Sequence, residues 1–214
     1  MSCFEPVWFH DLHQRGSSST FLTHPALVVQ ERRTRVTRLD PRTGHQLWEA
    51  RCENPWGTLA ASEAGVFYLN QHQRLQCFGL ETGDVQWDIV LPSDLANHSA
   101  TYGNLIAVGN SVLVGGWRRY TRLLCLRSDG TMSWVYERLH DYAPPIPGPW
   151  GIAVVCTRMV RRDVALVDVE TGRTLQDIAF PVALIRTIKA RPYSDTAIGS
   201  LPRPDRVAYM SLIL

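Results

Sequence analysis

Residues 36–48 read VTRLDPRTGHQLW, and the same pattern returns three more times along the chain. The other copies are LQCFGLETGDVQW (75–87), LLCLRSDGTMSW (123–134) and VALVDVETGRTLQ (164–176). Each copy has an alternating apolar run, a polar turn ending in glycine, and a second short alternating run, which is typical of a β-hairpin with one buried face. Four residues after the turn glycine, three copies carry a tryptophan and the last a glutamine: Trp48, Trp87, Trp134 and Gln176.

Two further strand-like runs precede each hairpin. The nearer runs are ALVVQ (26–30), GVFYL (65–69), SVLVGGW (111–117) and GIAVVC (151–156). Looser stretches stand before them, namely STFLTH, GTLAAS, GNLIAVG and APPIPGP. Each unit therefore predicts four antiparallel strands, which we name A to D in chain order. Positions 48, 87, 134 and 176 are 39, 47 and 42 residues apart, and this period is typical of a propeller blade.

The two ends of the chain complement each other. Trp8, in EPVWFHDL, stands about one period before Trp48 and predicts a D strand. The tail offers three runs that suit strands A, B and C: ALIRTIKA (183–190), DTAIGSL (195–201) and RVAYMSLIL (206–214). A blade shared between head and tail leaves no open sheet edge. The alternative is a piece of a longer propeller, cut within a blade.

The sequence therefore predicts an all-β fold, a five-bladed β-propeller whose N-terminal strand closes the C-terminal blade. Residues 1–214 would form a single domain. The expected blades are 17–51, 57–91, 103–138, 143–179, and 183–214 together with 4–12.

Composition places the chain among ordinary globular proteins, with 45% hydrophobic and 20% charged residues. No run of 18 apolar residues occurs, so no membrane span is expected. The N-terminus, MSCFEPVWFHDLHQRG, lacks the basic start and apolar core of a secretory signal. We therefore expect a cytoplasmic protein, unless a leader was removed. The five cysteines form no CxxC or adjacent pair, which favours buried, reduced thiols.

The motif L-D-x-x-T-G-x-x-x-W, as in LDPRTGHQLW (39–48), resembles the PQQ-like repeat. That repeat builds quinoprotein dehydrogenase propellers and non-catalytic relatives, including the assembly scaffold lipoprotein of the Gram-negative bacterial outer membrane. The resemblance implies that the tryptophans dock between neighbouring blades. The chain departs from the quinoprotein enzymes in having about five blades rather than eight and no adjacent cysteine pair. No equivalent of their calcium-binding carboxylate can be assigned. The resemblance thus points to the non-catalytic branch, and no cofactor is expected.

No motif of catalysis or metal binding stands out, because GxSxG, P-loop, GxGxxG and HExxH are all absent. His10 and His13 could be two metal ligands, yet no further Cys or His lies nearby, so a solvated loop is the preferred interpretation. His98, His140 and Tyr142 stand in the two longest D-to-A connections, which project over one end of the ring where propellers commonly bind ligands. Catalysis by His98, His140 or Asp141 is one alternative, and ordinary surface residues are the other.

Arginine is concentrated in the connections between strands B and C. Of the 22 basic residues, 21 are Arg and only Lys189 is lysine, which a GC-rich genome would also produce. The B–C connections hold twelve arginines: Arg32, Arg33, Arg35, Arg74, Arg118, Arg119, Arg122, Arg158, Arg161, Arg162, Arg203 and Arg206. The C–D turns lean towards acids: Asp40, Glu81, Asp84, Asp129, Asp168 and Glu170 against Arg42, Arg127 and Arg173. B–C and C–D connections lie at opposite faces of a propeller, so one face would be basic. Exposed hairpin tips in an arginine-rich proteome give the same pattern without any function.

The function predicted from these patterns is a non-enzymatic interaction scaffold. It would bind an acidic protein partner, or another anionic ligand, through Arg33, Arg74, Arg119, Arg162 and Arg203, with the longer loops beside them. Nucleic acid is the less favoured partner, since aromatic residues accompany arginine in only one B–C connection, and no membrane partner is expected. A propeller that binds a small ligand or carbohydrate is the alternative, followed by an enzyme that uses the central loops.

Overall fold

The computed structural model describes residues 8–11, 20–22, 26–31, 35–52, 57–70, 74–92, 105–115, 122–137, 145–149, 151–158, 161–179 and 206–209. All regular structure in these ranges is β-strand, which confirms the all-β prediction. Within the same ranges no helix is long and apolar enough to cross a membrane.

Four sheets each contain four consecutive antiparallel strands, as the repeat predicts. We name them blades 1 to 4. Blade 1 consists of β2 (Thr20–Leu22), β3 (Leu27–Glu31), β4 (Arg35–Leu39) and β5 (Gln46–Arg51). Blade 2 consists of β6 (Gly57–Ser62), β7 (Gly65–Asn70), β8 (Arg74–Phe78) and β9 (Val85–Val90). Blade 3 consists of β10 (Leu105–Val108), β11 (Ser111–Gly115), β12 (Leu123–Arg127) and β13 (Met132–Tyr136). Blade 4 consists of β14 (Ile146–Gly148), β15 (Gly151–Arg158), β16 (Arg161–Val167) and β17 (Thr174–Ala179).

A fifth, two-stranded sheet joins the head of the chain to its tail. We call it the terminal sheet. It pairs β1 (Trp8–Asp11) with β18 (Arg206–Tyr209) in antiparallel register, with Trp8 opposite Tyr209. The pairing repeats the C–D hairpins, where Trp87 lies opposite Cys77. The predicted partnership of head and tail is thereby confirmed. The count of five blades and the single domain 1–214 stay predictions, because 183–201 lie outside the described residues.

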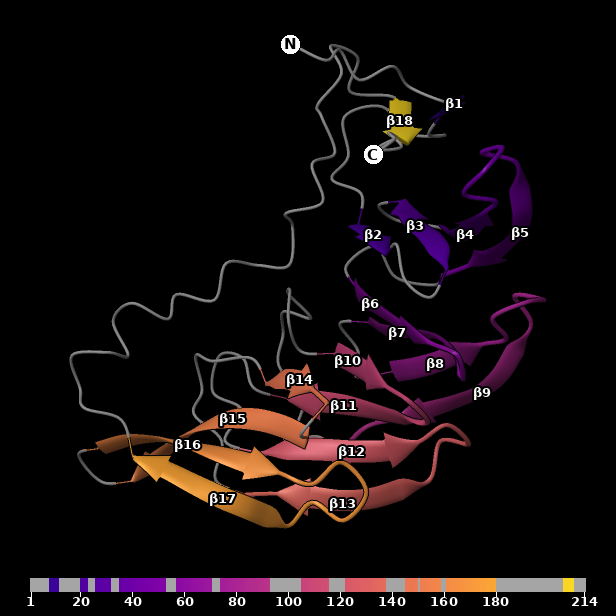
Figure 1. Ribbon diagram of the computed structural model, residues 1–214. Coiled ribbons are helices and arrows are strands. Elements are labelled where there is room, and N and C mark those ends of the chain that lie inside the picture. The colour runs from indigo at the N-terminus through magenta and orange to yellow at the C-terminus, as the bar shows by residue number, and fades with distance from the viewer. Residues whose placement is uncertain are drawn as a thin grey trace, which may run out of the picture.

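The sheets are arranged in a row, face beside face. Figure 1 shows the terminal sheet beside blade 1 at one end and blade 4 at the other. Apolar side chains fill the space between successive sheets. Val28, Trp48 and Tyr68 belong to the cluster between blades 1 and 2, and Phe67 and Leu124 to the cluster between blades 2 and 3. Alternation along each strand therefore gives every inner sheet two buried faces.

The C–D turns are built alike in three blades. In blade 4 the Gly172 amide donates to the Asp168 carbonyl, and the Asp168 amide donates to the Arg173 carbonyl. Gly172 has a φ of +69°, a left-handed conformation that glycine adopts without a steric penalty. Gly44, Gly83 and Gly130 have similar φ values of 71°, 74° and 84°. The turn glycines of the repeat are therefore required by backbone geometry.

Candidate interaction surface

The repeated tryptophans hold each sheet to the next. The Trp48 Nε1 group donates to the Leu80 carbonyl of blade 2 at 2.8 Å. The Trp87 indole donates to the Ser128 carbonyl of blade 3 at 2.6 Å. Trp134 and Val169 make the equivalent bond between blades 3 and 4 at 2.9 Å. A buried indole needs such a partner for its N–H group, so a turn carbonyl of the next blade anchors each ring.

Each anchored ring also lies on the turn glycine of the next blade. A Cβ atom placed on Gly83 would come 2.6 Å from the ring of Trp48, and one on Gly172 would come 2.5 Å from Trp134. Trp8 of the terminal sheet follows the same rule, because it contacts Gly44 and donates to the Pro41 carbonyl at 2.9 Å. Glycine is therefore needed at these turns for close approach as well as for backbone conformation.

The B–C edge, the edge of each blade at which strand B ends and strand C begins, carries a repeated ion pair that the sequence analysis missed. Arg74 Nε contacts both Asp88 oxygens at 2.6 and 2.7 Å. Arg35 pairs with Glu49 at 2.8 Å in blade 1. Arg122 and Glu137 approach to 3.6 Å in blade 3. Each pair joins a residue at or directly before the start of strand C to one in or directly after strand D of the same blade. These pairs balance part of the arginine charge within the blade.

Arg38 has a different role, at the contact between blades 1 and 2. Its guanidinium donates to the Leu80 carbonyl at 2.6 Å and pairs with Glu81 at 2.6 Å. The same carbonyl accepts the bond from Trp48. Hydrogen bonding to Arg38 lowers the pKa of the Glu81 carboxyl from its ordinary value. This arginine therefore reinforces a tryptophan anchor.

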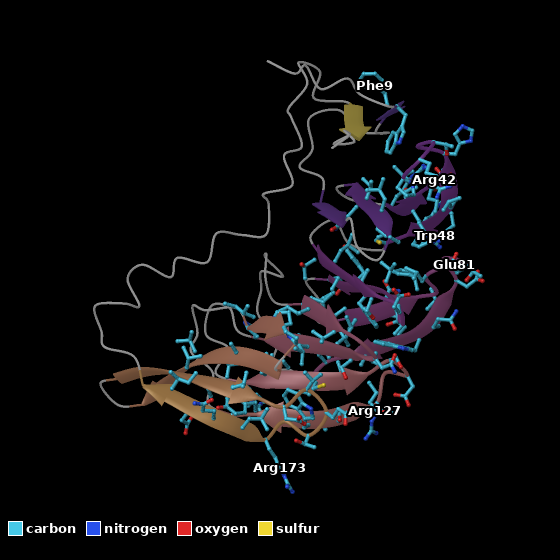
Figure 2. All side chains as sticks on the ribbon, viewed as in Figure 1. Phe9, Arg42, Trp48, Glu81, Arg127 and Arg173 are labelled. Carbon is cyan, nitrogen blue, oxygen red and sulfur yellow. The ribbon has the colours of Figure 1, made fainter. Side chains whose placement is uncertain are left out.

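The C–D edge, which holds the turns between strands C and D, carries exposed acids. Figure 2 shows Arg42, Glu81, Arg127 and Arg173 along one margin of the row of sheets. Hydrogen bonds from Thr171 lower the pKa of the Asp168 carboxyl, and those from Thr131 lower that of Asp129. These acids thus stay ionised well into acid, and the C–D edge keeps its predicted excess of negative charge.

Three of the cysteines are structural. Cys52, Cys77 and Cys125 are free and buried, as predicted. Burial raises the pKa of the Cys52 thiol to about 12 and those of Cys77 and Cys125 to about 11. The reactive thiolate is therefore scarce at these positions near neutral pH. No group of three or more His, Cys, Asp or Glu residues arranged for a metal ion occurs among the residues placed by the structure.

The predicted binding residues fall mostly outside the described ranges. Arg33, Arg119, Arg203, His98, His140 and Tyr142 all lie there, so their placement stays a prediction. Arg162 lies in β16, where only its backbone is described. Arg74 is described fully, and it joins its own blade through Asp88 while 44% of its side chain remains exposed.

Comparison with known proteins supports the fold. A family model described as outer membrane protein assembly factor BamB matches residues 32–192. No curated relative matches the sequence. The solved structure of BamB from Moraxella catarrhalis is similar, with 15% identity and a TM-score of 0.59. The similarity covers 85% of this chain and 53% of that one.

Two quinohemoprotein alcohol dehydrogenases resemble the chain to a similar degree. The Pseudomonas putida HK5 enzyme is 13% identical over 82% of this chain and 36% of its own, with a TM-score of 0.59. The Comamonas testosteroni enzyme is 12% identical over 82% and 37%, with a TM-score of 0.58. At such identities the likeness shows the fold alone, and the chain spans about half or less of the length of these proteins.

Proposed function

The chain belongs to the family of the outer membrane protein assembly factor BamB, and from this premise we propose that it is a non-enzymatic scaffold for protein binding. Its partner carries an acidic surface or another anionic group, and the arginines of the B–C edge bind it. The family match is the observation that carries this proposal, since the matching model is named after an assembly factor.

The charge distribution supports the choice of edge. The exposed C–D turns hold six acids and three arginines, so an acidic partner is repelled there. The strand-start arginines Arg35, Arg74 and Arg122 are balanced by acids of their own blades. The proposal therefore rests mainly on Arg33, Arg119, Arg162 and Arg203. A basic edge of this kind speeds association with anions and makes it sensitive to salt.

The test is a double charge reversal, Arg119→Glu with Arg162→Glu. Pulldown from the native host at low and high salt, with mass spectrometry, identifies the partner. Binding of that purified partner is then measured for the wild type and the variant. We expect the variant to lose binding while its melting temperature stays unchanged, because charges at the predicted surface contribute little to stability.

The matched control is Arg42→Glu with Arg173→Glu. It makes the same change in net charge at the C–D edge, where both arginines are exposed. This control should keep the partner at low salt. Equal loss of binding in both variants would show a response to net charge only, and unchanged binding in the Arg119/Arg162 variant would contradict the proposal.

Cytoplasmic location stays a prediction, which fractionation of the host would check.

A further inference from the structure

Strand β9 (Val85–Val90) forms the outer edge of blade 2. No described strand pairs with its outer side, and Figure 1 shows it at the same margin of the row of sheets as β5. Within the described residues its side chains bond inside blade 2 and, through Trp87, with the Ser128 carbonyl of blade 3. The outward N–H and C=O groups of an open edge are a template for pairing with another strand.

The four D strands differ in how well their edges are protected. Proteins commonly block an open edge with charged residues or proline. Strand β5 carries Glu49, and the exposed Asp177 stands on β17. Strand β13 is uncharged but shorter, and it ends at the buried Tyr136. The single charge of β9, Asp88, is held by Arg74 at 2.6 and 2.7 Å, so β9 lacks a free charge along its edge.

Both ends of β9 expose a large apolar side chain. Val85 is 54% exposed and Val90 is 70% exposed. Trp87 and Ile89 between them are partly buried. An extended segment that added to this edge would cover these side chains with its own alternate residues, while its backbone continued the ladder of the sheet.

Charges at the two ends of β9 indicate the orientation of such a segment. Val90 lies opposite Arg74 in the strand register, and 44% of the Arg74 side chain is exposed beside its partner Asp88. At the other end Val85 follows Asp84, which is exposed. The complementary segment is apolar in its middle, with an acidic end beside Arg74 and a basic end beside Asp84.

We propose that the outer edge of β9 binds an extended, largely apolar segment of a partner protein by strand addition. The segment becomes a fifth strand of blade 2. Main-chain hydrogen bonds supply affinity, and the contacts with Val85 and Val90 supply specificity. This site uses none of the four arginines on which the proposed function mainly rests, so the two proposals are tested by different variants.

The test selects peptides from a random library against the full chain and measures their binding by fluorescence anisotropy. Selected peptides should alternate apolar residues and should protect the amides of β9 from hydrogen exchange. Val85→Lys with Val90→Lys should weaken their binding about tenfold, because two apolar cross-strand pairs are lost and lysine disfavours pairing at an edge. The matched control is Leu47→Lys with Leu175→Lys, which adds the same charge at residues of β5 and β17 that are 52% and 56% exposed. It should bind the peptides like the wild type.

A second measurement leaves the protein unchanged, so it holds even where the lysine variant misfolds. Methyl groups on alternate peptide nitrogens remove the N–H donors from one edge of a strand only. One methylated pattern should abolish binding, and the pattern shifted by one residue should retain it. Equal binding by both patterns, unchanged binding in the Val85/Val90 variant, or the lack of any peptide that protects β9 would overturn the proposal. A wild-type dimer that this variant abolishes would also overturn it, since a second copy would then occupy the edge.

Discussion

The interfaces on the two sides of blade 2 share their anchors and differ in their filling. Between blades 2 and 3 the core cluster is apolar, from Phe67 and Leu75 to Val112 and Leu124, and the buried polar residues on that face of β6 are the small Thr58 and Ser62. Between blades 1 and 2 the buried set includes larger polar groups. Gln30 lies on the same side of β3 as Val28, and Gln76 lies opposite Tyr68, so strand alternation directs both towards this interface. The side-chain oxygens of both glutamines are buried, and neither has a hydrogen-bond partner among the described residues.

The comparison shows which part of the interface the repeat specifies. Tryptophan, turn glycine and turn carbonyl are conserved between blades because they set the geometry of stacking. The filling between them varies, and a buried acceptor without a donor costs about 1–3 kcal/mol. We therefore expect the interface between blades 1 and 2 to be the weaker of the two.

The largest effect should come from removal of an anchor. Trp48 is 7% exposed, and Trp48→Ala should lower the free energy of unfolding by about 3–5 kcal/mol, as for other buried aromatic residues. The matched change at the position that lacks the tryptophan, Gln176→Ala, should cost almost nothing, since Gln176 is exposed. Urea denaturation of both variants measures this. Similar losses of unfolding free energy in both variants would contradict the role of Trp48 as an anchor between blades.

Two glycines allow the cost of crowding against a tryptophan ring to be separated from the cost of left-handed backbone strain. Gly83 has a φ of +74° and lies under the ring of Trp48, whereas Gly109 has a φ of +54° and no atom within 4 Å of its missing Cβ. Gly109→Ala should therefore cost only the left-handed strain, about 1–2 kcal/mol. Gly83→Ala should cost about 1–3 kcal/mol more, because the ring must move. Thermal or urea unfolding gives the difference, and equal losses would show that the ring can shift freely.

Replacing a buried glutamine tests the polar filling directly. Gln30→Met keeps the size of the side chain and removes the unpaired oxygen, so it should raise the free energy of unfolding by about 1 kcal/mol. Gln76→Met is the control. It also removes the hydrogen bond from Gln76 Nε2 to Asp88 at 3.1 Å, and its gain should be smaller or absent. A loss of stability in Gln30→Met would mean that the oxygen is satisfied, for example by an ordered water.

The sequence was sufficient for the features that repeat at fixed spacing. The strands and the turn glycines follow from the repeat, because each is a property of one hairpin. The docking of Trp48, Trp87 and Trp134 between blades was implied by the resemblance to the PQQ-like repeat. The ion pairs were not predicted. Arg74 and Asp88 lie on neighbouring strands but are not directly opposite each other, and the register of this strand pairing shifts between Cys77 and Phe78. The buried glutamines between blades 1 and 2 were not predicted either, because the repeat does not indicate which interface Gln30 faces. The loop arginines of the predicted surface fall outside the described ranges.

The smallest effect concerns the C–D turns that receive the anchors. Asp168 accepts hydrogen bonds from the amide and hydroxyl of Thr171, both at 2.7 Å, and these bonds lower its pKa below 3.8. Since the folded state favours the ionised form, this contribution is fully present above the unfolded pKa and is lost as the pH falls through the folded value. Asp168→Asn should therefore lower the free energy of unfolding slightly at neutral pH. The variant should also lose less of this free energy than the wild type as the pH falls into the acid range. Asp84 makes no equivalent bond through its carboxyl among the described residues, so Asp84→Asn is the control and should leave the free energy of urea unfolding at neutral pH unchanged. Identical acid profiles for the wild type and Asp168→Asn would show that the turn does not depend on this charge, and that the carbonyl presented to Trp134 is held by the backbone alone.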